Sequence, residues 1–266
     1  MAASPTIDVS RLIKDFGTLR ALSGLNLSVY KGEIYGLLGP NGAGKTTTLR
    51  ILSALEAPTD GSVRVLGYDP VQNPTEVKAR VGYVAETATL YDSLTPREYL
   101  ELVASIRRLD QGVVNTRVAQ LVRGFGVEEF FDSPIGTLSL GTKQKVAVIA
   151  SLVHEPSVLL LDEPLNGMDA KTSRIMKELI SLHAENGGTV IFSSHIMEVV
   201  ESICTRIGII SGGVIIVEGT MDELRERAGR NDSTLEQVFL TITKEEEKVA
   251  DTVSMLREAF FRNENK

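Results

Sequence analysis

Hydrophobic residues along this chain follow two alternating patterns. Short apolar runs, typical of strands buried on both faces of a sheet, are separated by stretches in which apolar residues recur at helical spacing. This alternation predicts an α/β fold, in which helices cover both faces of a mostly parallel sheet. We expect strands at Ile34–Leu38, Gly61–Gly67, Val81–Ala85, Val158–Leu161, Thr189–Phe192, Arg206–Ile210 and Val214–Val217.

The beginning of the chain follows a different pattern. Ile7–Phe16 and Leu25–Tyr30 alternate apolar and polar positions, which predicts two short strands. A turn at Lys31-Gly32 leads from them into Ile34–Leu38, where we expect the parallel sheet to begin.

Helical spacing marks several other regions. We expect helices at Thr46–Leu55 and Lys171–Glu185, and the spacing across Pro96–Phe131 predicts a helical insert in the α/β frame. The chain after Thr220 is also predicted to be helical. An apolar stripe near its end indicates packing within the chain, with a dimer or partner surface as the alternative. The stripe consists of Val249, Val253, Leu256 and Phe260.

The composition is that of an ordinary soluble protein. Of the 266 residues, 42% are hydrophobic and 24% are charged, and 28 basic against 35 acidic residues give a formal net charge of −7. The longest stretch without Asp, Glu, Lys or Arg, Asn186–Met197, has 12 residues, whereas a membrane span needs about 20 apolar residues. We therefore expect no membrane span. Met1–Ser10 shows no secretory signal, which predicts a cytoplasmic protein.

Two classes of function are disfavoured by the composition. The single cysteine, Cys204, has no partner for an intrachain disulfide, and its apolar neighbours indicate a packed thiol rather than a nucleophile. An acidic chain with 5% aromatic residues and no tryptophan lacks the basic, aromatic-lined surface of a nucleic-acid binder. We expect neither redox chemistry nor a nucleic-acid partner.

A glycine-rich segment between a predicted strand and a predicted helix matches the pattern of a phosphate-binding loop. It consists of Gly39, Pro40, Asn41, Gly42, Ala43, Gly44, Lys45 and Thr46, followed by Thr47. Its glycines let backbone N–H groups converge on phosphate oxygens, and the next helix adds the positive end of its dipole. Lys45 can reach the outer phosphates, and the Thr46 hydroxyl can ligate Mg²⁺. The segment predicts binding of a nucleoside triphosphate with magnesium, and the alternative is a plain glycine-rich turn.

Two consecutive carboxylates follow the predicted strand Val158–Leu161. Asp162 and Glu163 stand at the strand end, where α/β sheets bind ligands. Asp162 is expected to face Mg²⁺, and Glu163 to polarise a water molecule for attack on the γ-phosphate. Alone, such a pair is more often a strand edge before a turn, but the phosphate loop upstream favours the catalytic interpretation.

A third segment resembles a motif of a known family. Residues 138–144, Leu-Ser-Leu-Gly-Thr-Lys-Gln, precede an apolar helical run at Val146–Val153 and resemble the signature segment of ABC-type ATPases, usually LSGGQ. Such a helix start offers a Ser hydroxyl and unhindered backbone N–H groups to an anion. The motif order between Ile7 and Thr220 fits the family as well: phosphate loop, Glu86 after a strand, helical insert, signature, Asp162-Glu163, Asp169 and His195.

The resemblance implies a fold and a division of the chain. It implies a P-loop NTPase (RecA-like) core with an N-terminal antiparallel β subdomain and an inserted α-helical subdomain at about 87–137. Residues 1–220 then form the ATPase domain, and residues 221–266 form a helical C-terminal extension.

The resemblance also implies roles for single residues. In the family the signature meets the γ-phosphate bound by the opposite subunit, which assigns Ser139 and Gly141 to the ATP of a second copy. Phe16 is similar to the aromatic residue that stacks on adenine, with a core position as the alternative. His195 is similar to the histidine that contacts the γ-phosphate, and Asp169 to the aspartate at the subunit interface. Without the family order, His195 would be unremarkable and Asp169 would indicate a turn and helix cap.

Two positions depart from the family pattern. Glu86 stands where most members have Gln, a ligand of Mg²⁺ and water; Glu keeps the oxygen but adds charge, and an exposed strand-end residue is the alternative. Similar Glu substitutions occur in the branch with separate polytopic export subunits, including drug and ion efflux systems. Leu140 replaces the first signature glycine and removes some backbone freedom, while Ser139 and Gly141 are retained.

The sequence favours the ATP-binding subunit of an ABC transporter. We expect a homodimer that closes around Mg-ATP, hydrolyses ATP and powers separate integral membrane permease subunits at the cytoplasmic face of the membrane, with export favoured over import. The first alternative is a soluble ABC-type ATPase with a regulatory or assembly role. The second is a small-molecule kinase or GTPase, which leaves the signature and His195 unexplained, and the chain has no Asn-Lys-x-Asp motif.

Overall fold

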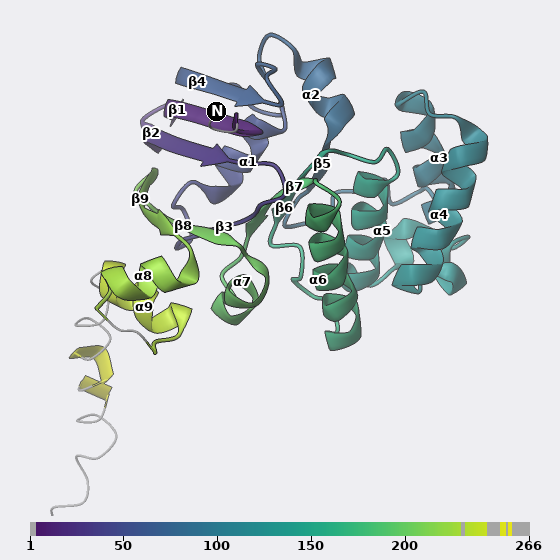
Figure 1. Cartoon of the computed structure of the whole chain (residues 1–266). Coiled ribbons are helices and arrows are strands. Elements are labelled where there is room, and N and C mark those ends of the chain that lie inside the picture. The colour runs from purple at the N-terminus through teal and green to yellow at the C-terminus, as the bar shows by residue number, and fades with distance from the viewer. Residues whose placement is uncertain (1–3, 230–231, 244–250, 254, 257–266) are drawn as a thin grey trace, which may run out of the picture.

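Two β-sheets organise the chain (Figure 1). The structure, a computed structural model, describes residues 4–229, 232–243, 251–253 and 255–256. An antiparallel sheet has the strand order β2-β1-β4, and a larger sheet has the order β5-β6-β7-β3-β8-β9. The strands are β1 (Ile7–Phe16), β2 (Leu19–Val29), β3 (Ile34–Leu38), β4 (Asp60–Val65), β5 (Val81–Val84), β6 (Val158–Asp162), β7 (Thr189–Ser193), β8 (Arg206–Ser211) and β9 (Val214–Gly219).

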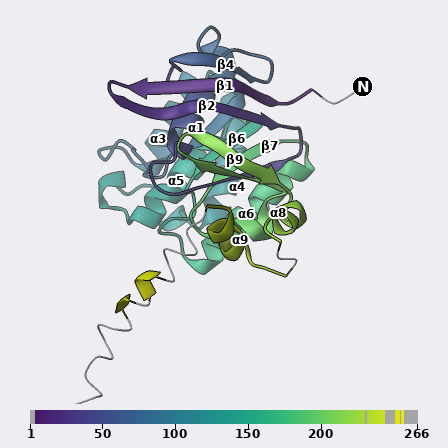
Figure 2. The ribbon, with the colours of Figure 1, turned by 90° about the vertical axis from the view of Figure 1, so that its left-hand side faces the viewer.

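Helices cover the larger sheet and extend beyond it. Figure 2 shows the antiparallel sheet on one side of the larger sheet and α6, α8 and α9 on the other. Helices α3 and α4 lie between β5 and β6 in the chain, where the helical insert is expected. The helices are α1 (Lys45–Leu52), α2 (Pro74–Arg80), α3 (Pro96–Ile106), α4 (Gln111–Phe125), α5 (Leu140–Leu152), α6 (Ala170–Glu185), α7 (Met197–Ile203), α8 (Met221–Arg227) and α9 (Leu235–Thr243).

The larger sheet is parallel except at one edge. Strands β5, β6, β7, β3 and β8 pair in parallel, and β9 pairs antiparallel with β8. Every residue of β3, β6 and β7 is buried, which explains why these strands have continuous apolar runs instead of an alternation. The predicted α/β fold with an N-terminal antiparallel sheet is therefore confirmed.

Alternate residues of the central strands serve two separate hydrophobic cores. Along β6, Leu159 and Leu161 belong to the core that includes residues of α5, α6 and α7. Val158 and Leu160 belong to the second core, which includes residues of α1 and the antiparallel sheet. Because side chains alternate between the two faces of each strand, one face of the larger sheet packs against α5, α6 and α7. The other face packs against α1 and the antiparallel sheet.

Several element ends differ from the predictions because the backbone turns there. The strand predicted at Leu25–Tyr30 is the second half of β2, whose pairing with β1 shifts register along its length. Helix α1 ends at Leu52, earlier than predicted, because Ala54 adopts a positive φ of 57°. The helical insert is interrupted between α3 and α4, where Arg108 has a φ of 54°.

Two helices were not predicted from the sequence. Helices α2 and α7 have seven residues each, and each buries one side chain, Val77 and Val200 respectively. A helix with one inward-facing residue makes no apolar stripe, so periodicity does not reveal it.

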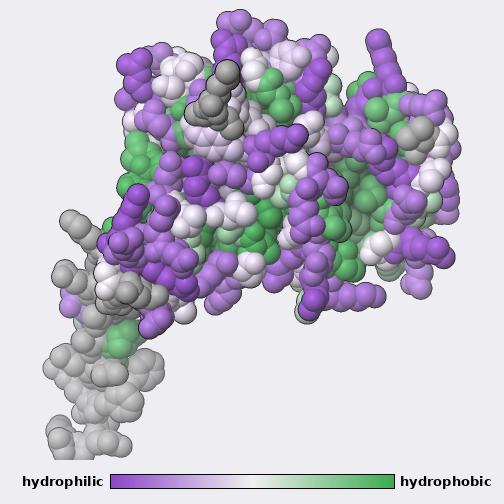
Figure 3. Space-filling view, viewed as in Figure 1, coloured by the Kyte–Doolittle hydropathy of each residue, from purple (hydrophilic) through white to green (hydrophobic). Residues whose placement is uncertain are grey.

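The surface of the molecule and the end of the chain test further predictions. Hydrophilic side chains cover α6 in Figure 3, and hydrophobic ones show on both sides of it. None of the described helices is long and apolar enough to cross a bilayer. In the predicted apolar stripe, Val249 and Phe260 lie outside the described residues, while Val253 and Leu256 are 43% and 51% exposed, so the expected packing is not found for these two.

Burial raises the pKa of the Cys204 thiol, in agreement with the packed thiol that we predicted.

Gly208 on β8 leaves the space that the buried ring of Tyr35 fills. The Tyr35 hydroxyl donates to Glu218 Oε2 on β9 over 3.0 Å, and a Cβ at Gly208 would overlap with this hydroxyl oxygen. We predict that Gly208→Ala lowers the free energy of unfolding by about 1–3 kcal/mol through overpacking. Urea unfolding followed by circular dichroism measures the change.

A matched control for this prediction is Gly124→Ala in α4. Gly124 is exposed, and no atom would lie within 4 Å of the added Cβ. This substitution should raise the free energy of unfolding by about 0.5–1 kcal/mol, because alanine restricts the unfolded chain and favours the helix. Equal effects of the two substitutions would contradict the packing argument.

Candidate active site

The carboxyl ends of parallel strands β3, β6 and β7 meet at one cavity of about 730 Å³. Most of the site residues predicted from the sequence line it. They are Phe16, Gly39, Pro40, Asn41, Gly42, Ala43, Gly44, Lys45, Thr46, Thr47, Glu86, Asp162, Glu163 and His195. Ser139, Gly141 and Asp169 do not line it.

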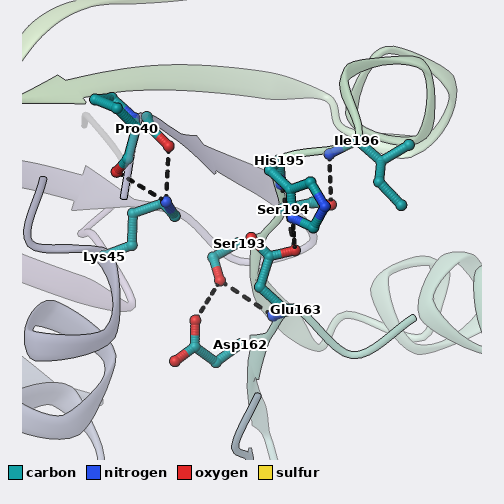
Figure 4. Close-up of polar contacts among 9 residues, drawn as sticks. Pro40, Lys45, Asp162, Glu163, Ser193, Ser194, His195 and Ile196 are labelled. Carbon is teal, nitrogen blue, oxygen red and sulfur yellow. Dashed lines mark hydrogen bonds and ion pairs between the residues drawn. The ribbon is translucent and has the colours of Figure 1, made fainter. Parts of the chain in front are cut away.

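The glycine-rich loop joins β3 to α1 and forms one wall of this cavity. Gly44 has a φ of 108° where α1 begins, and a Cβ there would lie 2.7 Å from Leu22 Cδ2, so only glycine fits. Lys45 is buried, and its Nζ donates to the carbonyls of Gly39 (2.7 Å) and Pro40 (3.2 Å), as Figure 4 shows. The first N–H groups of a helix have no acceptor within the helix. A positive charge and a helix start therefore lie together at the cavity, which suits an anion.

Asp162, the last residue of β6, has one carboxylate oxygen in use and one free. Its Oδ1 accepts a hydrogen bond from Ser193 Oγ over 2.6 Å. Asp162 is only 1% exposed, and its Oδ2 has no hydrogen-bond partner among the described residues. A buried carboxylate oxygen without a partner is costly, so this oxygen fits a cation.

The donors at this point are of the type that Mg²⁺ takes. Asp162, Thr46 and Glu86 supply oxygen atoms to the same cavity. In the described part of the chain, no three or more His, Cys, Asp and Glu side chains gather as a complete metal cage. Mg²⁺ usually binds to one or two carboxylates together with substrate phosphates and water, so such a cage is not needed.

Glu163 and His195 form a hydrogen-bonded pair across the ends of β6 and β7. Glu163 adopts a φ of 48°, a left-handed conformation that is uncommon for a residue with a side chain, and its N–H donates to Ser193 O over 3.1 Å. Glu163 Oε2 lies 2.9 Å from His195 Nδ1 and accepts from the His195 backbone N–H over 3.3 Å (Figure 4). Because a carboxylate only accepts, His195 Nδ1 is the donor.

Phe16 lies in the cavity rather than in a core. It is 46% exposed, and Lys14 Nζ lies 4.7 Å from the centre of its ring. Lys14 is held in turn by Glu56 Oε1, over 2.7 Å. An exposed ring at the edge of the cavity can stack on a flat ligand, whereas the alternative core position is not found.

The signature residues lie at helix starts outside the cavity. Ser139 caps α5 by accepting from the Thr142 N–H over 3.2 Å, and a Cβ at Gly141 would lie 2.6 Å from Gly167 O. Leu140 is 77% exposed. Asp169 caps α6, which agrees with the helix cap given above as the alternative role of this residue. Hydrogen bonds from Thr172 lower the pKa of its carboxyl group.

Several residues that shape the site were not predicted. Ser193 binds Asp162, and Gln144 Nε2 donates to Ala85 O, next to Glu86, over 3.2 Å. The position of Ser193 just before Ser194-His195 was the available signal in the sequence. Met197 and Phe239 also line the cavity, and nothing in the local sequence of either indicates a ligand. The remaining unpredicted lining residues are Leu19, Ala21 and Leu38.

The chain matches a family model and a set of curated proteins. It matches the ABC transporter family model over residues 22–166. It is 36% identical to the ABC transporter ATP-binding protein NatA of Bacillus subtilis, over 88% of this chain and 95% of that protein. It is 37% identical to the bacitracin transport ATP-binding protein BcrA of Enterococcus faecalis, over 83% of this chain and 71% of that protein. It is 36% identical to the probable multidrug ABC transporter ATP-binding protein YbhF of Escherichia coli, but spans 42% of its length.

Solved structures have the same fold. The structure of an ATP-binding subunit of an ABC transporter superposes with a TM-score of 0.85 and 28% identity, over 90% of this chain and 99% of that chain. A dimeric, post-hydrolysis ATP-binding cassette bound to ADP and Pi superposes with a TM-score of 0.72 and 25% identity, over 81% of this chain and 98% of that chain.

The free oxygen of Asp162 leads to a prediction about magnesium. Asp162→Asn keeps an oxygen that accepts from Ser193 but removes the charge, so we expect Mg²⁺ to add no further stabilisation to the protein with ATP. In the wild type, Mg²⁺ with ATP should raise the melting temperature above that with ATP and EDTA. Asp8→Asn is the control, because Asp8 is an exposed carboxylate that also accepts from a serine, Ser28. A full Mg²⁺ response in Asp162→Asn would contradict this role.

Proposed function

We propose that this chain, which belongs to the ABC transporter family, is the ATP-binding and ATP-hydrolysing subunit of a transporter. As a member of this family, the chain is an ATPase. The observation that carries the proposal is the cavity at which the phosphate loop, Asp162, Glu163 and His195 meet. The size of the cavity and the charges that line it suit a nucleoside triphosphate with Mg²⁺.

The phosphate loop holds the triphosphate in this proposal. Lys45 exchanges the carbonyls of Gly39 and Pro40 for phosphate oxygens, and the start of α1 adds its N–H groups. Thr46 and Asp162 hold Mg²⁺, with Glu86 beside them, and Phe16 stacks on the adenine ring. When bound, Mg²⁺ neutralises phosphate charge and polarises the γ-phosphate.

Glu163 is the general base for hydrolysis. Its side chain lines the same cavity as the phosphate loop, where the carboxylate can accept a proton from a water molecule that attacks the γ-phosphate. The hydrogen bonds from His195 orient the carboxylate, and the left-handed backbone at Glu163 directs the side chain. His195 also contacts the γ-phosphate in this proposal, and its bond to Glu163 fixes the orientation of its ring.

A second copy of the chain completes the site. Ser139 and Gly141 lie at the start of α5, outside the chain's own cavity, and a helix start binds anions well. We assign these residues to the ATP in the opposite copy, with Asp169 at the interface between copies. The dimeric state of the similar ATP-binding cassette supports this arrangement.

Integral membrane permease subunits are the further partner. The relatives are named as transporter ATP-binding proteins, which supports a subunit that works with a permease at the cytoplasmic face of the membrane. Export is favoured because similar proteins are named for resistance to daunorubicin/doxorubicin and to linearmycin, and removal of a drug from the cell is one way to resist it. Residues 1–220 form the ATPase domain in this proposal, with the helical subdomain at about 87–137, and residues 221–266 form an extension. The comparisons give no support to a regulatory ATPase without transport.

We predict that Glu163→Gln stops hydrolysis but preserves ATP binding. Loss of a general base lowers a rate by about 10²–10⁴-fold, and a complex that cannot hydrolyse ATP should accumulate as a dimer. Phosphate release and size-exclusion chromatography with Mg-ATP measure the two effects. Glu185→Gln, at an exposed position on α6, is the matched control. Hydrolysis at the wild-type rate by Glu163→Gln would refute the role of Glu163.

A separate prediction concerns the permease. Affinity isolation of Glu163→Gln from gently solubilised native membranes, with Mg-ATP, should recover a polytopic membrane protein in a fixed ratio to this chain, identified by mass spectrometry. Vesicles rebuilt with that protein should then show ATP-driven transport away from the side that holds this chain. A soluble dimer with no membrane protein would favour the regulatory ATPase instead, and transport in the opposite direction would refute export.

A further inference from the structure

An aromatic residue from the far end of the chain lines the nucleotide cavity. Phe239 belongs to α9, more than 70 residues after Asp162 and Glu163 in the chain, and lies beyond the segment that matches the family model. It is 9% exposed and belongs to the same hydrophobic core as Val200 of α7. The C-terminal extension therefore reaches the site at which we place hydrolysis.

Phe239 lines the same cavity as His195, the residue that donates to Glu163. Helix α9 packs against α7, and α7 begins at Met197, which lines the cavity as well. His195 precedes this helix by two residues. The start of α7 therefore lies two residues from the histidine that donates to Glu163.

A polar clamp ties α7 to the extension. Glu201 on α7 accepts from Arg225 Nη2 on α8 over 2.7 Å, and from the backbone N–H of Leu235, the first residue of α9, over 3.1 Å. Arg225 Nε also donates to Ser233 O over 2.8 Å, just before α9. Three helices are thus joined through one carboxylate and one guanidinium, a charge-assisted pair.

The start of α7 needs this support because the helix is short. It has seven residues and buries only Val200, and its N-cap residue, Ile196, makes no side-chain cap. A helix of this length has little stability of its own and depends on tertiary packing. Its position relative to Glu163 is therefore set by the elements that pack on it, of which α9 is one.

We propose that the C-terminal extension positions the hydrolysis site, with Phe239 supporting the start of α7 so that His195 stays within reach of Glu163. This inference rests on the proposed ATPase function. Phe239 acts through His195 and is a positioning residue. Loss of its ring should therefore slow the chemical step more than it weakens ATP binding, which depends mainly on the phosphate loop.

The test compares variants of the complete chain by steady-state ATP hydrolysis. Phe239→Leu should lower kcat about tenfold, since small displacements of catalytic groups are costly, and change KM for ATP less than about twofold. Phe239→Tyr keeps the ring and should restore kcat to within about twofold of the wild type. Glu236→Gln, an exposed position on the same helix, is the control and should hydrolyse ATP normally.

A second variant keeps the inference testable if Phe239→Leu does not fold. Glu201→Gln weakens the clamp at a partly exposed position, and it should lower kcat in the same way as Phe239→Leu, again with KM unchanged. If the wild type hydrolyses ATP and these variants have an unchanged kcat, the inference is wrong, while the proposed function stands. A raised KM with an unchanged kcat would also overturn it, because Phe239 would then only bind nucleotide. An inactive wild type would overturn the proposed function and this inference with it.

Discussion

The pairing register of three parallel strands fixes where the functional groups of this molecule meet. Strand β7 lies between β6 and β3, and its last residue, Ser193, pairs with Asp162 on one side and Leu37 on the other. The segments that follow these positions therefore leave the sheet at the same edge. A register slip of one residue on β6 would turn Asp162 to the opposite face and break its bond to Ser193. The fully buried, branched and aromatic residues of these strands oppose such a slip.

The same edge carries the parts of the structure that are hardest to stabilise. It holds a buried lysine that donates to loop carbonyls, a buried carboxylate oxygen with no partner, and a glutamate in a left-handed conformation. Each feature costs free energy in the protein alone. In the function that we propose, phosphate oxygens would bind the lysine and Mg²⁺ would bind the free carboxylate oxygen. Features that lower the stability of the folded chain thus gather at the carboxyl edge of the parallel sheet. Such a concentration of costly features is typical of an active site.

The sequence predicted the central strands and the residues of this edge, because both have local signals. Continuous apolar runs mark β3, β6 and β7, and the glycine-rich loop and the Asp-Glu pair follow two of them directly. Short helices with one buried residue, such as α7, gave no such signal. The position of Phe239 in the cavity was also out of reach, because it results from the packing of α9 on α7, an arrangement of tertiary structure alone. The exposure of Phe16 could be decided only once the cavity was known, because strand alternation places a residue on a face without saying what covers that face.

In the dimer that we propose, two copies of this chain share each nucleotide between the cavity of one and the signature segment of the other. A structure of Glu163→Gln determined with ATP and Mg²⁺ would reveal this arrangement. We expect ATP in the cavity at Lys45, with Ser139 and Gly141 of the second copy at its γ-phosphate. ATP bound away from Lys45, or bound in a single copy with no second Ser139 beside it, would show that the two copies do not share the nucleotide in this way.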